Sequence, residues 1–219
     1  MPDEWGKAVG TMSGSLQAAG RIKLLVLFVA MLYVGSYLTG WYLVSVRSPI
    51  AVETTETLRE AVLTEEPFTS IIGSLERGEL LTAILVTFAV NLTMGAFLTT
   101  TLPGIVPILG VLGVVTVTCV RGFVIGVVYP EVLAASPAAF ALGLGTLILE
   151  LGAYVFSGAA GINIALAPIL PRRYGVQGRW VAFKMAWKDA ARIFVIVVLL
   201  LALGAIWEMT GLFLILRPP

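Results

Sequence analysis

The stretch LLVLFVAMLYVGSYLTGWYLVSV, from Leu24 to Val46, contains no charged residue. An α-helix rises about 1.5 Å per residue, so a helix of this length spans a hydrocarbon core about 30 Å thick. Aromatic residues of the kind that gather at membrane interfaces fill its second half. The stretch is too long for a cleaved signal peptide and lacks a small-residue cleavage site, so it predicts a retained transmembrane helix.

The rest of the chain is similarly apolar. Among its 219 residues 58% are hydrophobic and 12% are charged, whereas roughly 25% of residues are charged in a typical soluble domain. Several long apolar runs predict an all-α, polytopic bundle of about five transmembrane helices. We expect a single membrane domain, residues 1–219, in the plasma membrane. The predicted spans cover residues 24–46, 80–101, 105–128, 139–170 and 193–216.

Two hydrophilic segments interrupt these runs. Residues 47–79 are acidic, and their apolar residues are spaced as in two short helices lying against the membrane surface. Residues 171–192 are basic and amphipathic, which predicts an interfacial helix bound to the anionic lipids of the inner leaflet. A plain cytosolic loop is the alternative. The residues that define the interfacial helix are Trp180, Phe183, Lys184, Trp187 and Lys188.

The distribution of basic residues predicts the orientation of the bundle. Five spans place the N-terminus and residues 171–192 on one side, where nine of the 14 lysine and arginine residues lie. The acidic segment and the C-terminus share the other side, which has four. The positive-inside rule therefore predicts that the N-terminus is cytoplasmic and the C-terminus is outside.

The composition argues against several classes of chemistry. The chain contains no histidine, which is the commonest metal ligand and general base. Its one cysteine, Cys119, cannot form an intrachain disulfide. No phosphate-binding loop and no basic, aromatic pattern for nucleic acid occurs. We therefore expect a protein that is not an enzyme and that uses no metal, cofactor or nucleic acid.

Four polar residues lie inside the predicted spans: Asn91, Arg121, Glu150 and Glu208. At about 1.5 Å per residue, all four fall about 10 to 17 Å from the outer ends of their helices. An ion pair between Arg121 and Glu150 or Glu208 would offset most of the cost of burial. Ionisable residues in a membrane mark a functional site by default. The network could fix helix register, line a path for a solute or ion, or bind a partner.

Small residues predict close contacts between helices. Gly122-x-x-x-Gly126 and Ser157-x-x-x-Gly161 have the spacing that lets helix backbones approach each other in lipid. These contacts could form within one chain or between the copies of a homo-oligomer.

The order and spacing of several motifs between roughly Leu80 and Leu216 resemble the stage II sporulation protein M family. The motifs are Phe88-x-x-Asn91 with Gly95, Arg121-Gly122-Phe123-x-x-Gly126, Leu147-Ile148-Leu149-Glu150 leading into Ser157-Gly158-Ala159-Ala160-Gly161, and Trp207-Glu208. The resemblance implies five or six spans. Members commonly carry a His-Gly pair just before the glutamate, where this chain has Thr146 and Leu147.

The resemblance also implies a function. Sporulation members of the family are understood as scaffolds that hold cell-wall hydrolases at the engulfing membrane, and the family also occurs in organisms that make no spores. We therefore expect a non-catalytic scaffold that positions partner proteins. The alternative is a conduit for a small solute or ion through the polar residues. Few asparagines and glutamines, and more arginine than lysine, indicate a thermophile-like composition.

Overall fold

The computed structural model describes the backbone of residues 2–216 and the side chains of residues 12–215. This part of the chain is helical and contains no strand. The α-helices are α1 (Pro2–Arg21), α2 (Lys23–Ser45), α3 (Pro49–Thr64), α4 (Phe68–Arg77), α5 (Leu80–Val90), α6 (Leu109–Ala135), α7 (Pro137–Leu166) and α8 (Arg179–Leu216). A π-helix, η1 (Asn91–Thr101), and two 3₁₀ helices, η2 (Leu102–Ile105) and η3 (Pro171–Tyr174), complete the order.

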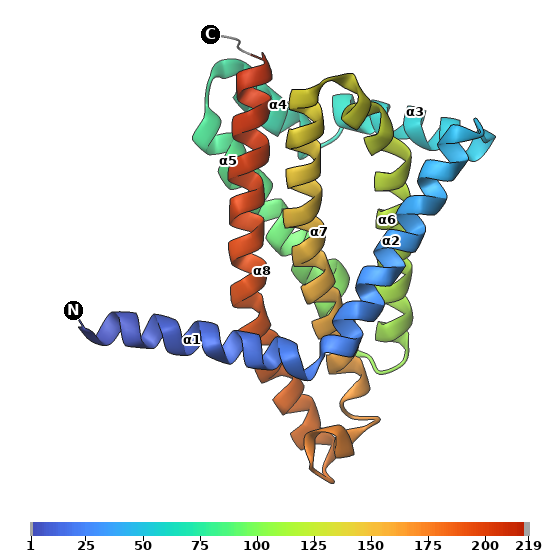
Figure 1. Ribbon diagram of the computed structural model, residues 1–219. Coiled ribbons are helices and arrows are strands. Elements are labelled where there is room, and N and C mark those ends of the chain that lie inside the picture. Colours follow the sequence, from blue (N-terminus) through green and yellow to red (C-terminus); the bar gives the residue numbers. More distant parts are fainter. Residues whose placement is uncertain (1, 217–219) are drawn as a thin grey trace.

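The predicted all-α membrane bundle is confirmed. Within the described residues, five helical segments are long and apolar enough to cross a membrane: Lys23–Ser45, Leu80–Ile105, Leu109–Ala135, Pro137–Leu166 and Arg179–Ile215. Figure 1 shows α3, α4 and the last turns of α8 at one end of the bundle, here called the α4 end. Helix α1 and η3 lie toward the other end of the bundle, here called the α1 end, and α1 runs across the direction of the transmembrane helices. In the orientation predicted from the basic residues, the α4 end lies outside the cell.

The third predicted span differs from α6 at both ends. Helix α6 starts later than expected and continues past Pro130, whose freed backbone groups a membrane bundle can satisfy locally. Helix α7 runs unbroken through Ser157 and Gly161. The expected break after the second span is present as η2, which contains Pro103.

The expected separate interfacial helix is absent from the described residues. The segment that carries Trp180, Phe183 and Trp187 forms the first turns of α8, because no proline interrupts the chain between Arg179 and Leu216. Phe183 and Trp187 pack against the hydrophobic core, while Trp180 is 64% exposed and stacks on Phe183. Lys184 lies 5.5 Å from the Trp180 ring centroid. The charge and aromatic spacing thus predicted a helix here, but this helix is continuous with the fifth span.

Helix α1 was not predicted. Its last residue, Arg21, donates from Nε to Oδ2 of Asp189 at 3.1 Å and from Nη2 to Oδ1. The Asp189 residue is only 4% exposed, and Arg192 lies 3.9 Å from it. A buried carboxylate is costly unless it is paired and hydrogen-bonded, so this contact holds the end of α1 against α8.

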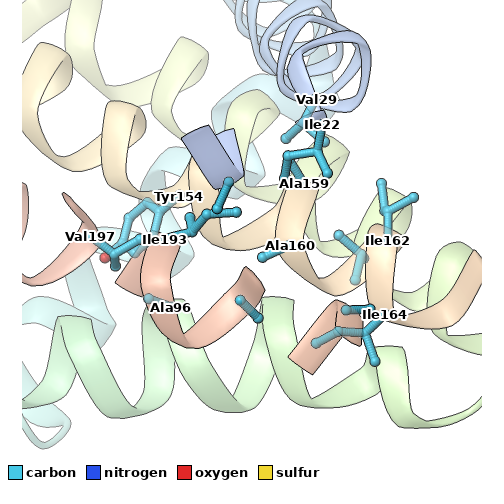
Figure 2. Close-up of a cluster of buried hydrophobic side chains, with 14 of the residues drawn as sticks. Ile22, Val29, Ala96, Tyr154, Ala159, Ala160, Ile162, Ile164, Ile193 and Val197 are labelled. Atoms are coloured by element: carbon cyan, nitrogen blue, oxygen red, sulfur yellow. The ribbon is translucent and has the colours of Figure 1, made fainter. Parts of the chain in front are cut away.

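The core gathers around α7. Figure 2 shows Tyr154, Ala159, Ala160, Ile162 and Ile164 beside side chains from neighbouring helices. Many of the buried α7 residues are small, so the helices beside it approach closely. Gly161 is an example, since a Cβ atom there would lie 2.0 Å from the carbonyl oxygen of Thr100. Beside it, the hydroxyl groups of Ser157 and Thr100 are hydrogen-bonded at 2.8 Å.

The second small-residue face joins α6 to α2. A Cβ atom at Gly126 would lie 2.1 Å from the carbonyl oxygen of Tyr37, and one at Gly122 would lie 3.0 Å from that of Tyr33. On the α2 side, a Cβ atom at Gly40 would lie 2.4 Å from the carbonyl oxygen of Phe123. Both glycine motifs are therefore used for packing within the chain.

This packing predicts different outcomes for two glycines of α2. Gly40→Ala should lower the free energy of unfolding by about 1–3 kcal/mol, because its methyl group forces α2 and α6 apart. Gly35→Ala is the matched control, since nothing lies within 4 Å of its Cβ position, and it should stay within about 1 kcal/mol of wild type. Thermal unfolding in detergent micelles measures both. Equal stability of the two variants would contradict the close contact.

Candidate functional site

The four polar residues reach the bundle interior from four different transmembrane segments. Asn91 is the first residue of η1, Arg121 lies in α6, Glu150 in α7 and Glu208 in α8. The Asn91 side chain donates from Nδ2 to Oε1 of Glu150 at 2.6 Å. Glu208 borders the same cavity as these two residues. We call Asn91, Glu150 and Glu208 the carboxylate layer.

The predicted ion pair of Arg121 is not formed. Among the described residues, neither Glu150 nor Glu208 is within salt-bridge distance of a lysine or arginine. The Arg121 guanidinium instead lies 4.1 Å from the centroid of the Tyr154 ring. Tyr154 follows Glu150 by one turn on the same face of α7. The guanidinium therefore contacts the Tyr154 ring and not the Glu150 carboxylate, which was its predicted partner.

Polar groups of the second span also hold the guanidinium. Both Nη atoms of Arg121 donate to the carbonyl oxygen of Gly95 at 3.4 Å, and Nη2 donates to the Thr99 hydroxyl at 3.2 Å. Nη1 contacts the hydroxyl of Tyr33 in α2 at 3.5 Å. We call Arg121, Tyr154, Gly95, Thr99 and Tyr33 the arginine layer. Three elements besides α6 thus share the cost of burying one cation.

The backbone acceptor for Arg121, the Gly95 carbonyl, lies within the π-helix η1. The hydroxyl of Thr99 also donates to the Gly95 carbonyl, at 2.8 Å, and such local bonds compete with regular helix bonding. Position 95 must be a glycine, since a Cβ atom there would lie 2.7 Å from the Tyr154 hydroxyl. Non-α turns inside helices occur frequently at functional sites. The unusual backbone of η1 therefore coincides with the buried charge.

A cavity of about 700 Å³ lies beside the carboxylate layer. Its polar residues are Thr87, Asn91, Tyr129, Glu150 and Glu208, from α5, η1, α6, α7 and α8. Apolar residues from the end of α3, from α4 and from the last turns of α8 form the remaining walls. Glu208 is about two turns from the end of α8. The polar groups therefore lie deep in the cavity, and the apolar walls lie nearer the α4 end.

Two buried threonine hydroxyls near the carboxylate layer have no hydrogen-bond partner among the described residues. Thr87 is 6% exposed and borders the cavity, and Thr146 is 2% exposed and precedes Glu150 by one turn. An unpaired buried hydroxyl costs about 1–3 kcal/mol, so Thr87 is a ready acceptor or donor for a molecule in the cavity. Thr146 stands where the family resemblance places a histidine.

Sequence reasoning missed several site residues. Thr87 lies four residues before Asn91, and Tyr154 lies four residues after Glu150. Helical periodicity alone puts residues at this spacing on one face. Tyr129 had no such signal, because the predicted third span ended before it.

The arginine layer predicts that ring replacement at position 154 matters more than loss of the hydroxyl. Tyr154→Leu removes the π surface over Arg121 and should lower the free energy of unfolding by about 2 kcal/mol more than Tyr154→Phe, which keeps it. Chemical unfolding in micelles compares the two variants. If Tyr154→Phe were as damaging as Tyr154→Leu, the ring would not be what stabilises the guanidinium.

Comparison with known proteins agrees with the site motifs. The family model described as stage II sporulation protein M matches residues 8–210. No curated protein and no solved structure matches the chain. The matched range includes both layers and the five transmembrane segments up to Thr210 of α8. The chain therefore belongs to the stage II sporulation protein M family.

Proposed function

We propose that this protein is a non-catalytic scaffold of the plasma membrane that docks partner proteins on α3 and α4. One observation carries the proposal: Glu53, Glu56 and Glu60 are all exposed and lie three and four residues apart on α3. This spacing puts three carboxylates on one face of the helix. We call them the acidic stripe. Its chemistry suits a basic segment of a partner protein on the outer side of the membrane.

Helices α3 and α4 are fixed to the transmembrane bundle. Leu75 of α4 is 2% exposed and packs with Ala83 of α5 and Met209 of α8. Arg59 of α3 pairs with Glu131 of α6 at 3.0 Å. This exposed ion pair adds little stability, so the apolar contact of α4 supplies most of the anchoring. A rigid, charged surface is what a scaffold needs to position a partner.

Neutralising the acidic stripe tests the scaffold. The triple variant E53Q/E56Q/E60Q should reduce the partner recovered by cross-linked affinity capture from native membranes by about ten-fold, because the complementary charge is lost. The matched triple variant E53D/E56D/E60D keeps the charges and should retain the partner. Mass spectrometry measures the stoichiometry. Undiminished recovery with the glutamine variant, at unchanged thermal stability, would contradict docking on the stripe.

A conduit for a small solute or ion is the second candidate. It is favoured by the succession of polar groups along α7: Glu150 in the carboxylate layer, Tyr154 in the arginine layer, and Ser157 bonded to Thr100. Residues at this spacing share one helix face, so they form a polar seam through the bundle toward the α1 end. Arg121 lies on this seam and would set its charge selectivity.

Liposome flux tests the conduit. Glu150→Gln should change the flux of a permeant solute by about ten-fold without unfolding the protein, since it removes a charge from the seam. Glu65→Gln, at an exposed position just after α3 and outside the acidic stripe, is the control and should leave flux unchanged. A wild-type protein that passes none of a broad panel of ions and small solutes would eliminate this candidate.

A further inference from the structure

The deep end of the cavity at the α4 end is lined by two carboxyl groups and, among the described residues, by no lysine or arginine. It holds two carboxylates, from Glu150 and Glu208, and the hydrogen bond that Glu150 accepts comes from a neutral amide. Among the described residues, neither carboxylate has a lysine or arginine within salt-bridge distance, and Arg121 is bound in the arginine layer. Buried charges are normally paired, so this deep end is suited to a cation from outside the chain.

The walls select among cations. Phe68, Ile71 and Leu75 from α4 and Met209 and Leu212 from α8 line the cavity. A bare metal ion needs a shell of oxygen ligands and makes no use of such apolar surface. A cavity of about 700 Å³ also exceeds the need of a single ion and is within the usual range for organic ligands. The walls therefore favour a cation attached to an apolar body.

Two further groups favour an amine over other organic cations. The Thr87 hydroxyl is 6% exposed, borders the cavity and lacks a partner, so its oxygen can accept an N–H hydrogen bond. Tyr129 adds an aromatic ring at the same depth, and aromatic rings attract ammonium groups. A protonated amine would bind both carboxylates and the hydroxyl at once.

We propose that this cavity binds a protonated amine that carries an apolar body, with Glu150 and Glu208 as its counter-charges and Thr87 as a hydrogen-bond acceptor. The amine could belong to a free amphiphile or to the headgroup of an aminophospholipid, since the chemistry is shared. The inference deepens the conduit proposal by naming its ligand class. It rests on that proposal only in one respect, because both use the carboxylate layer.

Equilibrium binding of octylammonium to the full-length protein in phosphatidylcholine nanodiscs tests the inference. Wild type should bind octylammonium saturably and at least about ten-fold more tightly than the neutral analogue octanol. E150Q/E208Q should weaken octylammonium binding by about ten-fold or more, and Thr87→Val by about three- to ten-fold. Glu65→Gln, at an exposed position just after α3 and outside the acidic stripe, should bind as wild type does.

Several outcomes would overturn the inference, and they are separable from failure of the conduit. Equal binding of octanol and octylammonium to wild type would show an apolar cavity without charge recognition, and this comparison needs no variant. Should the double variant fail to fold, unchanged octylammonium affinity in both Thr87→Val and Glu208→Gln would overturn the inference instead. Amine binding without any flux would contradict the conduit alone.

A second lipid composition distinguishes the two sources of the amine. If the ligand is a lipid headgroup, replacing part of the phosphatidylcholine by phosphatidylethanolamine should weaken octylammonium binding by competition, and the effect should vanish in E150Q/E208Q. If the ligand is a free amphiphile, octylammonium affinity should be the same in both membranes. Either result supports amine recognition at the carboxylate layer.

Discussion

The contact between the Arg121 guanidinium and the Tyr154 ring determines much of the bundle's interior. A cation in hydrocarbon must be given compensating groups, and the centroid of this ring lies 4.1 Å away. The second compensating group is the Gly95 carbonyl, which requires a glycine and a locally distorted helix. The buried arginine is thus bound where η1 and its glycine lie, beside the Tyr154 ring of α7.

Helix α7 combines packing and chemistry on a single face. Glu150, Tyr154, Ser157 and Gly161 follow one another at spacings of four, three and four residues, so all of them point toward the second span. Gly161 and Ser157 bring the backbones together at the α1 end, and Glu150 meets Asn91 nearer the α4 end. The small residues set the distance at which the polar residues can meet.

The five spans could be predicted from the sequence because each is a local property of about 20 apolar residues. Helix α1 could not, since its position depends on a contact between Arg21 and Asp189, which are far apart in the chain. The polar residues of the carboxylate layer were identifiable by type and depth. The partner of Arg121 was not, because Tyr154 and Glu150 lie on the same face of α7 and only the folded geometry decides which of them contacts Arg121.

The two proposals share helix α4. Leu75 fixes α4 to the bundle, and Phe68 and Ile71 of the same helix border the cavity, while the acidic stripe lies on the preceding helix. A partner bound to the stripe could alter amine affinity only if it binds two positions of α4 with different affinity. By linkage, an amine in the cavity would then change partner affinity by the same factor. A scaffold and a ligand-binding pocket are therefore compatible in one small membrane protein, because the end of α3 and one face of α4 both border the cavity.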